Sequence, residues 1–135
     1  MIKRLDHVGI VVDNLSEAQS FLESLGLKRV RDLRIPGRLN ASFYSCGEVD
    51  IEIMEISNED ERARRLRGEA ARIEHVAIEV DSLSTTVQAL NGLGVRMQTS
   101  DPVTLDKGTN YWTVEDTTDG VVYQLIELDQ MHRQT

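Results

Sequence analysis

The chain has 135 residues, of which 40% are apolar and 28% charged, which is ordinary for one globular domain. Its net charge of −8 argues against binding to nucleic acids or to an anionic membrane surface, because both need clustered lysine and arginine. The single cysteine, Cys46, excludes an intrachain disulfide, and no apolar stretch approaches the ~20 residues of a membrane span. We therefore expect a soluble cytoplasmic protein.

The first half of the chain predicts a βαβββ unit. Short β-branched or alternating runs indicate strands at residues 5–12, 28–35, 39–46 and 49–56. Between the first two strands, Asn14 or Ser16 can cap a helix whose apolar residues follow helical spacing, and Gly26 marks its end. Gly47-Glu48 is the predicted turn of the last hairpin.

The second half repeats this order. Strands are predicted at residues 73–80, 110–114 and 121–128, and residues 95–98 are expected to begin a further strand. Ser82 can cap a helix over residues 83–93, with Gly94 as its stop. Residues 100–110 are predicted to form a longer loop, and Asp119-Gly120 a turn.

We predict one domain over residues 1–135. Its parts are a module at 1–56, a polar linker at 57–72, a module at 73–128 and a tail at 129–135. The linker has acids and arginines spaced for i,i+4 pairs, which favours a solvated connecting helix or linker over a charged docking surface.

The two halves are copies of one unit. A shift of 68 positions (75 minus 7) aligns LDHVGIVVDNLSEAQSFLESLG with IEHVAIEVDSLSTTVQALNGLG and places His7 over His75. The last strand of each copy aligns as IEIME over YQLIE, which pairs Glu52 with Gln124 and Glu55 with Glu127. A duplicated unit with one histidine at the same place in each copy suggests a two-fold site. The alternative is that each histidine only begins a strand and bonds to neighbouring backbone.

Strand alternation places Glu52 on the opposite face from Ile51 and Ile53, which we expect to pack beneath the helix. A carboxylate within such an apolar strand is costly unless it is paired or binds a metal ion. The amide of Gln124 is also costly at such a position without a partner, although less so than a carboxylate. Glu127 falls on the helix side, where a surface acid at a strand end needs no function.

Together, the segments LDHVGIVVDNL, FLESLGL, VDIEIME, IEHVAIEVDSL and DGVVYQLIEL resemble the vicinal oxygen chelate superfamily, and within it the glyoxalase I and methylmalonyl-CoA epimerase branch. The resemblance implies the α+β glyoxalase/bleomycin-resistance/dioxygenase fold, in which two paired βαβββ modules form a cup-shaped mixed sheet with the helices outside. It also implies one divalent metal ion, held by residues of the first and last strands of each module. Those residues are His7, Glu52, His75 and Gln124. Homodimers are common in the superfamily, so we expect a homodimer.

Two imidazoles with oxygen ligands suit Co²⁺, Ni²⁺, Zn²⁺, Mn²⁺ or Fe²⁺, and four protein ligands leave positions open for a chelating substrate. The resemblance implies a metal-dependent isomerase or epimerase that acts on a small-molecule substrate with a carbonyl group, or a lyase of the lactoylglutathione lyase kind. Such an enzyme removes a proton next to the carbonyl group, and the metal ion stabilises the resulting enolate. Glu52 is the expected base, and the sequence offers no second acid–base group. In the epimerases one last-strand ligand is a glutamine; here the glutamine is in the second copy. Candidate substrate contacts are Asn110, Trp112 and Lys107.

Two other functions remain open. Two histidines and one carboxylate also form the ligand set of an Fe²⁺ ring-cleaving dioxygenase, although Gln124 would fill a position that oxygen chemistry needs open. A metal-free protein that binds a small hydrophobic molecule or an antibiotic is the third possibility, but such relatives typically lack the four ligands. A coenzyme A thioester would favour a basic rim, for which the net charge of −8 gives little support.

Overall fold

The computed structural model describes residues 1–105 and 107–133. The chain divides into two compact units, an N-terminal unit of His7–Glu74 and a C-terminal unit that combines Met1–Asp6 with His75–Thr135. The strands form one mixed eight-stranded sheet. Its order is β2 (Lys28–Ile35), β3 (Leu39–Cys46), β4 (Val49–Ile56), β1 (Ile2–Val12), β5 (Ala71–Val80), β8 (Val122–Leu128), β7 (Gly108–Trp112) and β6 (Val103–Leu105). Both units contain residues of β1 and of β5. The predicted α+β class with a mixed sheet is therefore confirmed.

The N-terminal unit has the predicted βαβββ order. Its elements are β1 (Ile2–Val12), α1 (Leu15–Ser24), β2 (Lys28–Ile35), β3 (Leu39–Cys46), β4 (Val49–Ile56) and α2 (Glu59–Leu66). β4 pairs in parallel with β1 and antiparallel with β3, while β2 pairs antiparallel with β3. This order brings the last strand of the unit beside its first strand.

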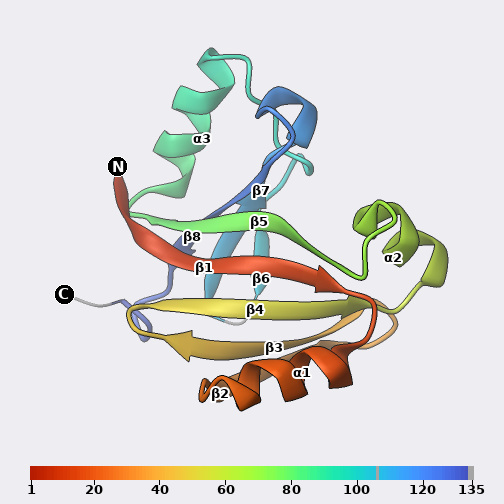
Figure 1. Cartoon of the computed structure of the whole chain (residues 1–135). Helices are drawn as coiled ribbons and strands as arrows, with labels where there is room; N and C mark the ends of the chain where they lie inside the picture. Colours follow the sequence, from red (N-terminus) through yellow and green to blue (C-terminus); the bar gives the residue numbers. More distant parts are fainter. Residues whose placement is uncertain (106, 134–135) are drawn as a thin grey trace. The chain divides into compact units, whose positions relative to one another are not determined.

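Helix α1 begins where the sequence predicts. The Asn14 side chain accepts a hydrogen bond from the Glu17 backbone N–H at 3.0 Å and so satisfies one of the free donors at the helix start. The helix buries Leu22 against Tyr44 and Ile53, and the ribbon shows it alongside β3 and β4 (Figure 1). Ile53 therefore lies on the helix side of β4, as expected.

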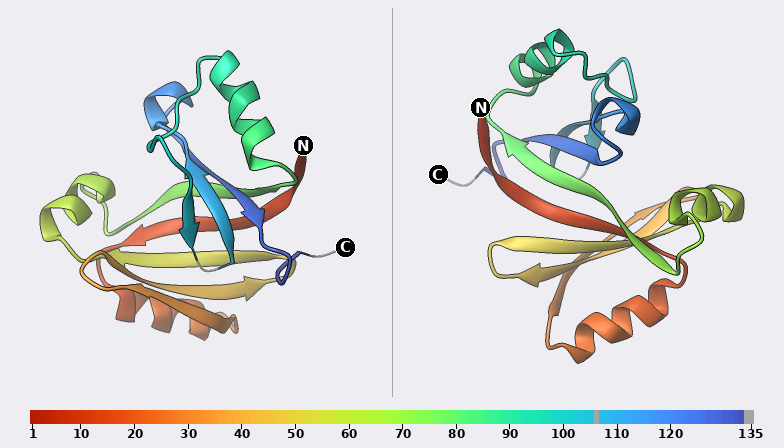
Figure 2. Two further views of the ribbon diagram at one scale, coloured as in Figure 1. Left: turned by 180° about the vertical axis from the view of Figure 1, so that it is seen from behind. Right: turned by 45° about the horizontal axis from the view of Figure 1, so that its top comes forward.

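The C-terminal unit repeats the order with shorter strands. Its elements are β5 (Ala71–Val80), α3 (Leu83–Gly92), β6 (Val103–Leu105), β7 (Gly108–Trp112), a 3-10 helix η1 (Glu115–Thr117) and β8 (Val122–Leu128). Ser82 caps α3 by accepting a hydrogen bond from the Thr85 N–H at 3.3 Å. The helix packs Leu83 against Val80 and Leu125, beside β7 and β8 (Figure 2).

One strand prediction is wrong. Residues 95–98 form no strand and contribute only an isolated bridge between Met97 and Thr113. The edge strand next to β7 is formed instead by β6, at Val103–Leu105, within the predicted loop. This short run could not be distinguished from a loop because it has only three residues. Gly108 permits the next strand to approach β8 closely, since a Cβ there would overlap the backbone carbonyl of Glu127.

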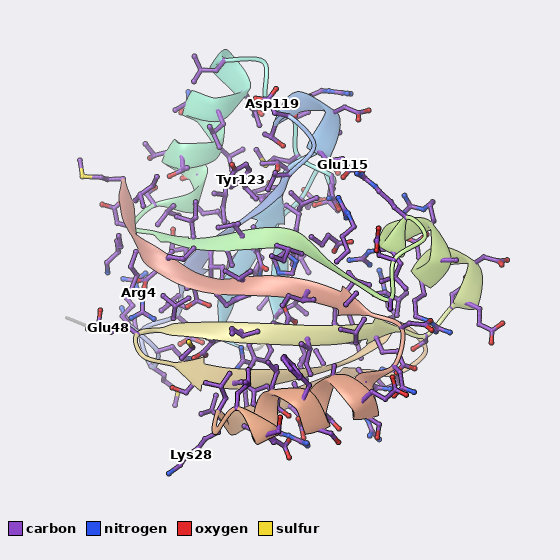
Figure 3. The ribbon with its side chains drawn as sticks, in the orientation of Figure 1. Arg4, Lys28, Glu48, Glu115, Asp119 and Tyr123 are labelled. Atoms are coloured by element: carbon purple, nitrogen blue, oxygen red, sulfur yellow. The ribbon has the colours of Figure 1, made fainter. Side chains whose placement is uncertain are left out.

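The polar segment between the modules contains a helix. In α2, Asn58 accepts a hydrogen bond from the Glu61 N–H, and Arg67 ends the helix in the left-handed conformation. The turns at Gly47-Glu48 and Asp119-Gly120 are present as predicted, and Glu48 and Asp119 are labelled in Figure 3. Residue 106 of the predicted loop and residues 134–135 of the predicted tail lie outside the described residues.

Candidate metal centre

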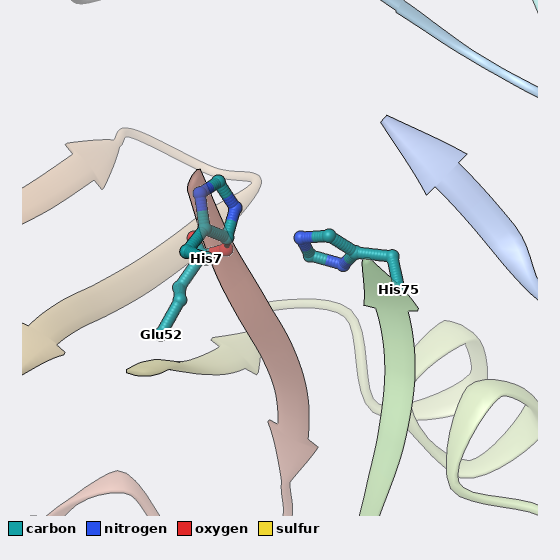
Figure 4. Close-up of side chains that lie close together, drawn as sticks. All are labelled: His7, Glu52 and His75. Atoms are coloured by element: carbon teal, nitrogen blue, oxygen red, sulfur yellow. Dashed lines mark ion pairs between the residues drawn. The ribbon is translucent and has the colours of Figure 1, made fainter. Parts of the chain in front are cut away.

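In the N-terminal unit, His7 and Glu52 come from adjacent parallel strands. Along the β1–β4 pair, His7 lies opposite Asp50 and Gly9 lies opposite Glu52. The His7 Nε2 atom lies 3.3 Å from the Glu52 Oε1 atom, and Figure 4 shows both side chains. His7 is 3% exposed and Glu52 5% exposed, so this pair lies in the protein interior.

The packing around His7 and Glu52 fixes both side chains. Glu52 stands on the face of β4 opposite Ile53, away from α1, as the alternation predicts. The Phe43 ring, directly opposite Glu52 on β3, meets the His7 ring edge to face with centroids 5.3 Å apart. The Arg31 guanidinium in turn lies 3.7 Å from the centre of the Phe43 ring. No pattern in the sequence pointed to Arg31, because its stacking depends on the pairing of β2 with β3.

In the C-terminal unit, His75 and Gln124 have the same relationship. The β5–β8 pair is also parallel, and its register places His75 opposite Val122 and Ala77 opposite Gln124. This is the register of the first pair, with Gln124 in the place of Glu52. His75, on β5 in Figure 4, is 4% exposed and Gln124 is 8% exposed. The Gln124 Nε2 atom donates a hydrogen bond to Asn110 Oδ1 at 3.0 Å.

The donor atoms suit a divalent ion. His7, Glu52 and His75 are buried, and each offers one ligand atom to a metal ion. Adjacent ligands of an octahedral ion with bonds of about 2.1 Å lie about 3 Å apart. The separation of 3.3 Å between His7 Nε2 and Glu52 Oε1 is close to that value. Imidazole nitrogen, carboxylate oxygen and amide oxygen are all ligands of first-row divalent metals.

Glu55 and Glu127, which are aligned in the repeat, each cap the helix of their own unit. Glu55 Oε2 accepts a hydrogen bond from the Leu15 N–H at 2.8 Å, and Glu127 Oε1 accepts one from the Leu83 N–H at 2.8 Å. A carboxylate at a helix N-terminus also interacts favourably with the helix dipole. Glu127 lies on the helix side as predicted, but the expectation that it has no role missed this contact. The alignment of the two glutamates was the available signal.

The acid that precedes each histidine is paired with a cation. Asp6 is buried, and Lys107 Nζ lies 2.9 and 3.1 Å from its two carboxylate oxygens. Glu74, which precedes His75, forms a bidentate ion pair with Arg65, and this hydrogen bonding raises the pKa of Arg65. Lys107, a predicted substrate contact, is therefore engaged by Asp6.

The other two predicted substrate contacts lie on β7. Asn110 is buried and hydrogen-bonded through its amide, whereas Trp112 is half-buried and lies opposite Gln124 in the β7–β8 register. Contact of these residues with a substrate remains a prediction.

Among the described residues, no helix is long and apolar enough to cross a membrane.

The comparisons with known proteins agree on the fold. Residues 6–113 match the family model described as glyoxalase/bleomycin resistance protein/dioxygenase superfamily. The uncharacterized protein YqjC of Bacillus subtilis is 30% identical over 99 residues, which are 71% of each chain.

Two solved structures are similar over nearly their whole length. Methylmalonyl-CoA epimerase from Mycobacterium tuberculosis has a TM-score of 0.85 and 21% identity, covering 96% of this chain and 91% of that one. A variant of Streptomyces coelicolor methylmalonyl-CoA epimerase in complex with 2-nitronate-propionyl-CoA has a TM-score of 0.87 and 15% identity, covering 99% and 100%. At these identities the likeness concerns the fold.

Proposed function

The chain belongs to the glyoxalase/bleomycin resistance protein/dioxygenase superfamily, and from that membership we propose that it is a metal-dependent isomerase or epimerase. Its substrate would be a small molecule with a carbonyl group next to an acidic C–H bond. The observation that carries the proposal is the repeated register. In each unit, a buried histidine lies next to a strand that carries a buried carboxylate or amide side chain, two residues beyond the residue opposite the histidine.

In this proposal one divalent ion is shared by the two units. His7 and Glu52 would bind it from the N-terminal unit, and His75 and Gln124 from the C-terminal unit. The burial of Glu52 supports this assignment, because a carboxylate in the interior needs a cation or several hydrogen bonds to compensate for the loss of water. A bound divalent ion would supply Lewis-acid polarisation of the substrate carbonyl.

Glu52 would accept the proton from the substrate. It is the only carboxylate among the four proposed ligands, and Gln124 cannot take up a proton at neutral pH. The Phe43 ring holds the His7 imidazole by its edge-to-face contact, and this in turn keeps His7 beside the Glu52 carboxylate. The position of the base would thus be fixed before the substrate binds.

Acyl-CoA thioesters with an acidic α-hydrogen are the first substrates to test. The support is the fold that this chain shares with methylmalonyl-CoA epimerases, one of which binds 2-nitronate-propionyl-CoA. Thiohemiacetals of the kind used by glyoxalase I form the second class, and they require no site for a nucleotide.

Two measurements test the proposal. The purified protein should contain one divalent ion per chain, and incubation with substrate in D₂O should place deuterium at the carbon next to the carbonyl. Oxygen uptake without deuterium exchange would instead indicate a dioxygenase. A protein that holds no metal, and whose melting temperature does not change with added Co²⁺, Ni²⁺, Zn²⁺, Mn²⁺ or Fe²⁺, would be a metal-free binding protein.

A further inference from the structure

Gln124 differs from Glu52 in having only one end that can bind a metal ion. Both oxygens of a carboxylate are ligands, so a carboxylate can rotate by half a turn and still bind. In an amide, only the carbonyl oxygen can be a ligand, because the NH₂ group presents two hydrogen-bond donors. A glutamine ligand in the wrong orientation would therefore present N–H groups to a cation.

Hydrogen bonds fix the orientation of the Asn110 amide. Its Nδ2 atom donates to the backbone carbonyls of Val103, at 3.2 Å, and of Gly108, at 3.3 Å. A reversed amide would place Oδ1 against two carbonyl oxygens, so only one orientation is compatible with both neighbours. Asn110 Oδ1 is consequently left to accept the hydrogen bond from Gln124 Nε2 at 3.0 Å. That bond uses the NH₂ end of Gln124 and leaves its carbonyl oxygen available.

The other repeat shows why this partner is needed only once. Asn110 lies opposite Ile126 in the β7–β8 pair, and Ala41 lies opposite Met54 in the β3–β4 pair. Met54 and Ile126 occupy the same place in the aligned strands IEIME and YQLIE, so Ala41 is the counterpart of Asn110. Both positions are buried, at 2% and 3% exposure. The repeat with the symmetric carboxylate has an alanine there, and the repeat with the amide has an asparagine.

We propose that Asn110 is a positioning residue that orients the Gln124 amide so that its carbonyl oxygen faces the metal ion. The inference rests on the proposed function, in which Gln124 is a ligand. It gives Asn110 a role other than the predicted substrate contact, because the contacts with Val103, Gly108 and Gln124 occupy both ends of its amide.

The test is a double-mutant cycle on metal affinity. Co²⁺ is titrated into the metal-free wild type, Asn110→Ala, Gln124→Glu and the double variant, by calorimetry and by the visible absorption of bound Co²⁺. Asn110→Ala should weaken Co²⁺ binding about 10- to 100-fold, as is typical when a partner that orients a ligand is lost. In the Gln124→Glu background the same substitution should cause no loss, because a carboxylate does not need to be oriented. Thr109→Ala, on the opposite face of β7, is the matched control and should leave affinity unchanged.

The outcomes separate this inference from the proposed function. If Asn110→Ala lowered the Co²⁺ affinity equally in the wild-type and Gln124→Glu backgrounds, Asn110 would have a general structural role and the inference would be overturned. Wild-type affinity in Asn110→Ala would overturn it as well, while leaving the proposed function intact. If the wild type does not bind Co²⁺, Ni²⁺ or Zn²⁺ at all, the proposed function itself is wrong and the inference falls with it. Thermal unfolding of each variant with a chelator present establishes that the metal-free protein is folded.

Discussion

The His7 Nε2 atom lies 3.3 Å from the Glu52 Oε1 atom, and both side chains are almost fully buried. Two strands that are far apart in the sequence but adjacent in the sheet bring them together, so neither residue depends on a loop for its position. An imidazole and a carboxylate in this arrangement can bind a cation, and the carboxylate can also take up a proton.

The first prediction concerns Glu52 as the base. Glu52→Gln keeps the size of the side chain and an oxygen ligand but removes the proton acceptor. We expect kcat to fall by about 10²- to 10⁴-fold, the usual contribution of a general base. Deuterium exchange at the substrate carbon in D₂O should fall in parallel. The matched variant is Gln124→Glu, which introduces a carboxylate at the equivalent position of the other repeat. If Glu52→Gln retained wild-type exchange, another group would have to be the base.

The second prediction concerns sharing of the metal ion between the units. Equilibrium dialysis should find one ion per wild-type chain, and His7→Ala and His75→Ala should each weaken binding by at least about 100-fold, since losing a ligand should cost more than losing its hydrogen-bond partner. His132→Ala, at an exposed histidine near the C-terminus, is the control. If each unit instead bound its own ion, the stoichiometry would be two and His75→Ala would leave the ion on His7 and Glu52 in place.

Metal binding should also stabilise the fold. A ligand that binds only the folded state stabilises it by about 2.7 kcal/mol at a free concentration of 100 times Kd. Thermal unfolding with added Zn²⁺ or Co²⁺ should therefore show a higher melting temperature than unfolding with a chelator. The increase should be absent from the double variant His7→Ala/His75→Ala. An equal increase in that variant would mean that the ion binds elsewhere.

The sequence allowed more to be predicted about the residues of the candidate site than about the side chains that hold them in position. The repeat alignment was sufficient to predict that His7 and His75 occupy equivalent places, as do Glu52 and Gln124, and strand alternation assigned Glu52 to the face away from the helix. Metal binding by these four residues remains a prediction. The bond between Asn110 and Gln124 could not be predicted in the same way. It depends on the register of β7 with β8 and on the position of β6, a strand of three residues without a periodic signal. Arg31 was missed for a similar reason, since its stacking on Phe43 follows from the pairing of β2 with β3.

The fourth prediction concerns the two glutamates that cap helices. Glu55→Ala and Glu127→Ala each remove the acceptor for the first backbone N–H of a helix, α1 in one case and α3 in the other. Each should lower the free energy of unfolding by about 0.5–2 kcal/mol, the range found when a capping side chain is removed. Urea denaturation measures the loss. Glu48→Ala removes the same charge from an exposed turn and should have little effect. An equal loss in Glu48→Ala would mean that the net charge, and not the cap, is responsible.

The last prediction uses Tyr44, whose ring is fully buried beneath α1. Its hydroxyl donates a hydrogen bond to Glu23 at 2.5 Å, and burial, together with this bond, raises the pKa of Tyr44. Tyr44→Phe should lower the free energy of unfolding by about 1 kcal/mol at pH 8, a modest value because Glu23 is solvent-exposed.

The sign of the pH dependence follows from the raised pKa. Tyr44 ionises in the unfolded chain at pH about 10, before it can ionise in the folded protein, so its contribution to stability is complete below that pH and is lost as the pH rises further. The difference in stability between wild type and Tyr44→Phe should therefore shrink between pH 9 and pH 11, as measured by urea denaturation at each pH. Tyr123→Phe, which removes the hydroxyl of a half-buried tyrosine in β8, is the control for the loss of a tyrosine hydroxyl. If the difference in free energy of unfolding between wild type and Tyr44→Phe did not change with pH, the hydroxyl would titrate alike in the folded and unfolded states.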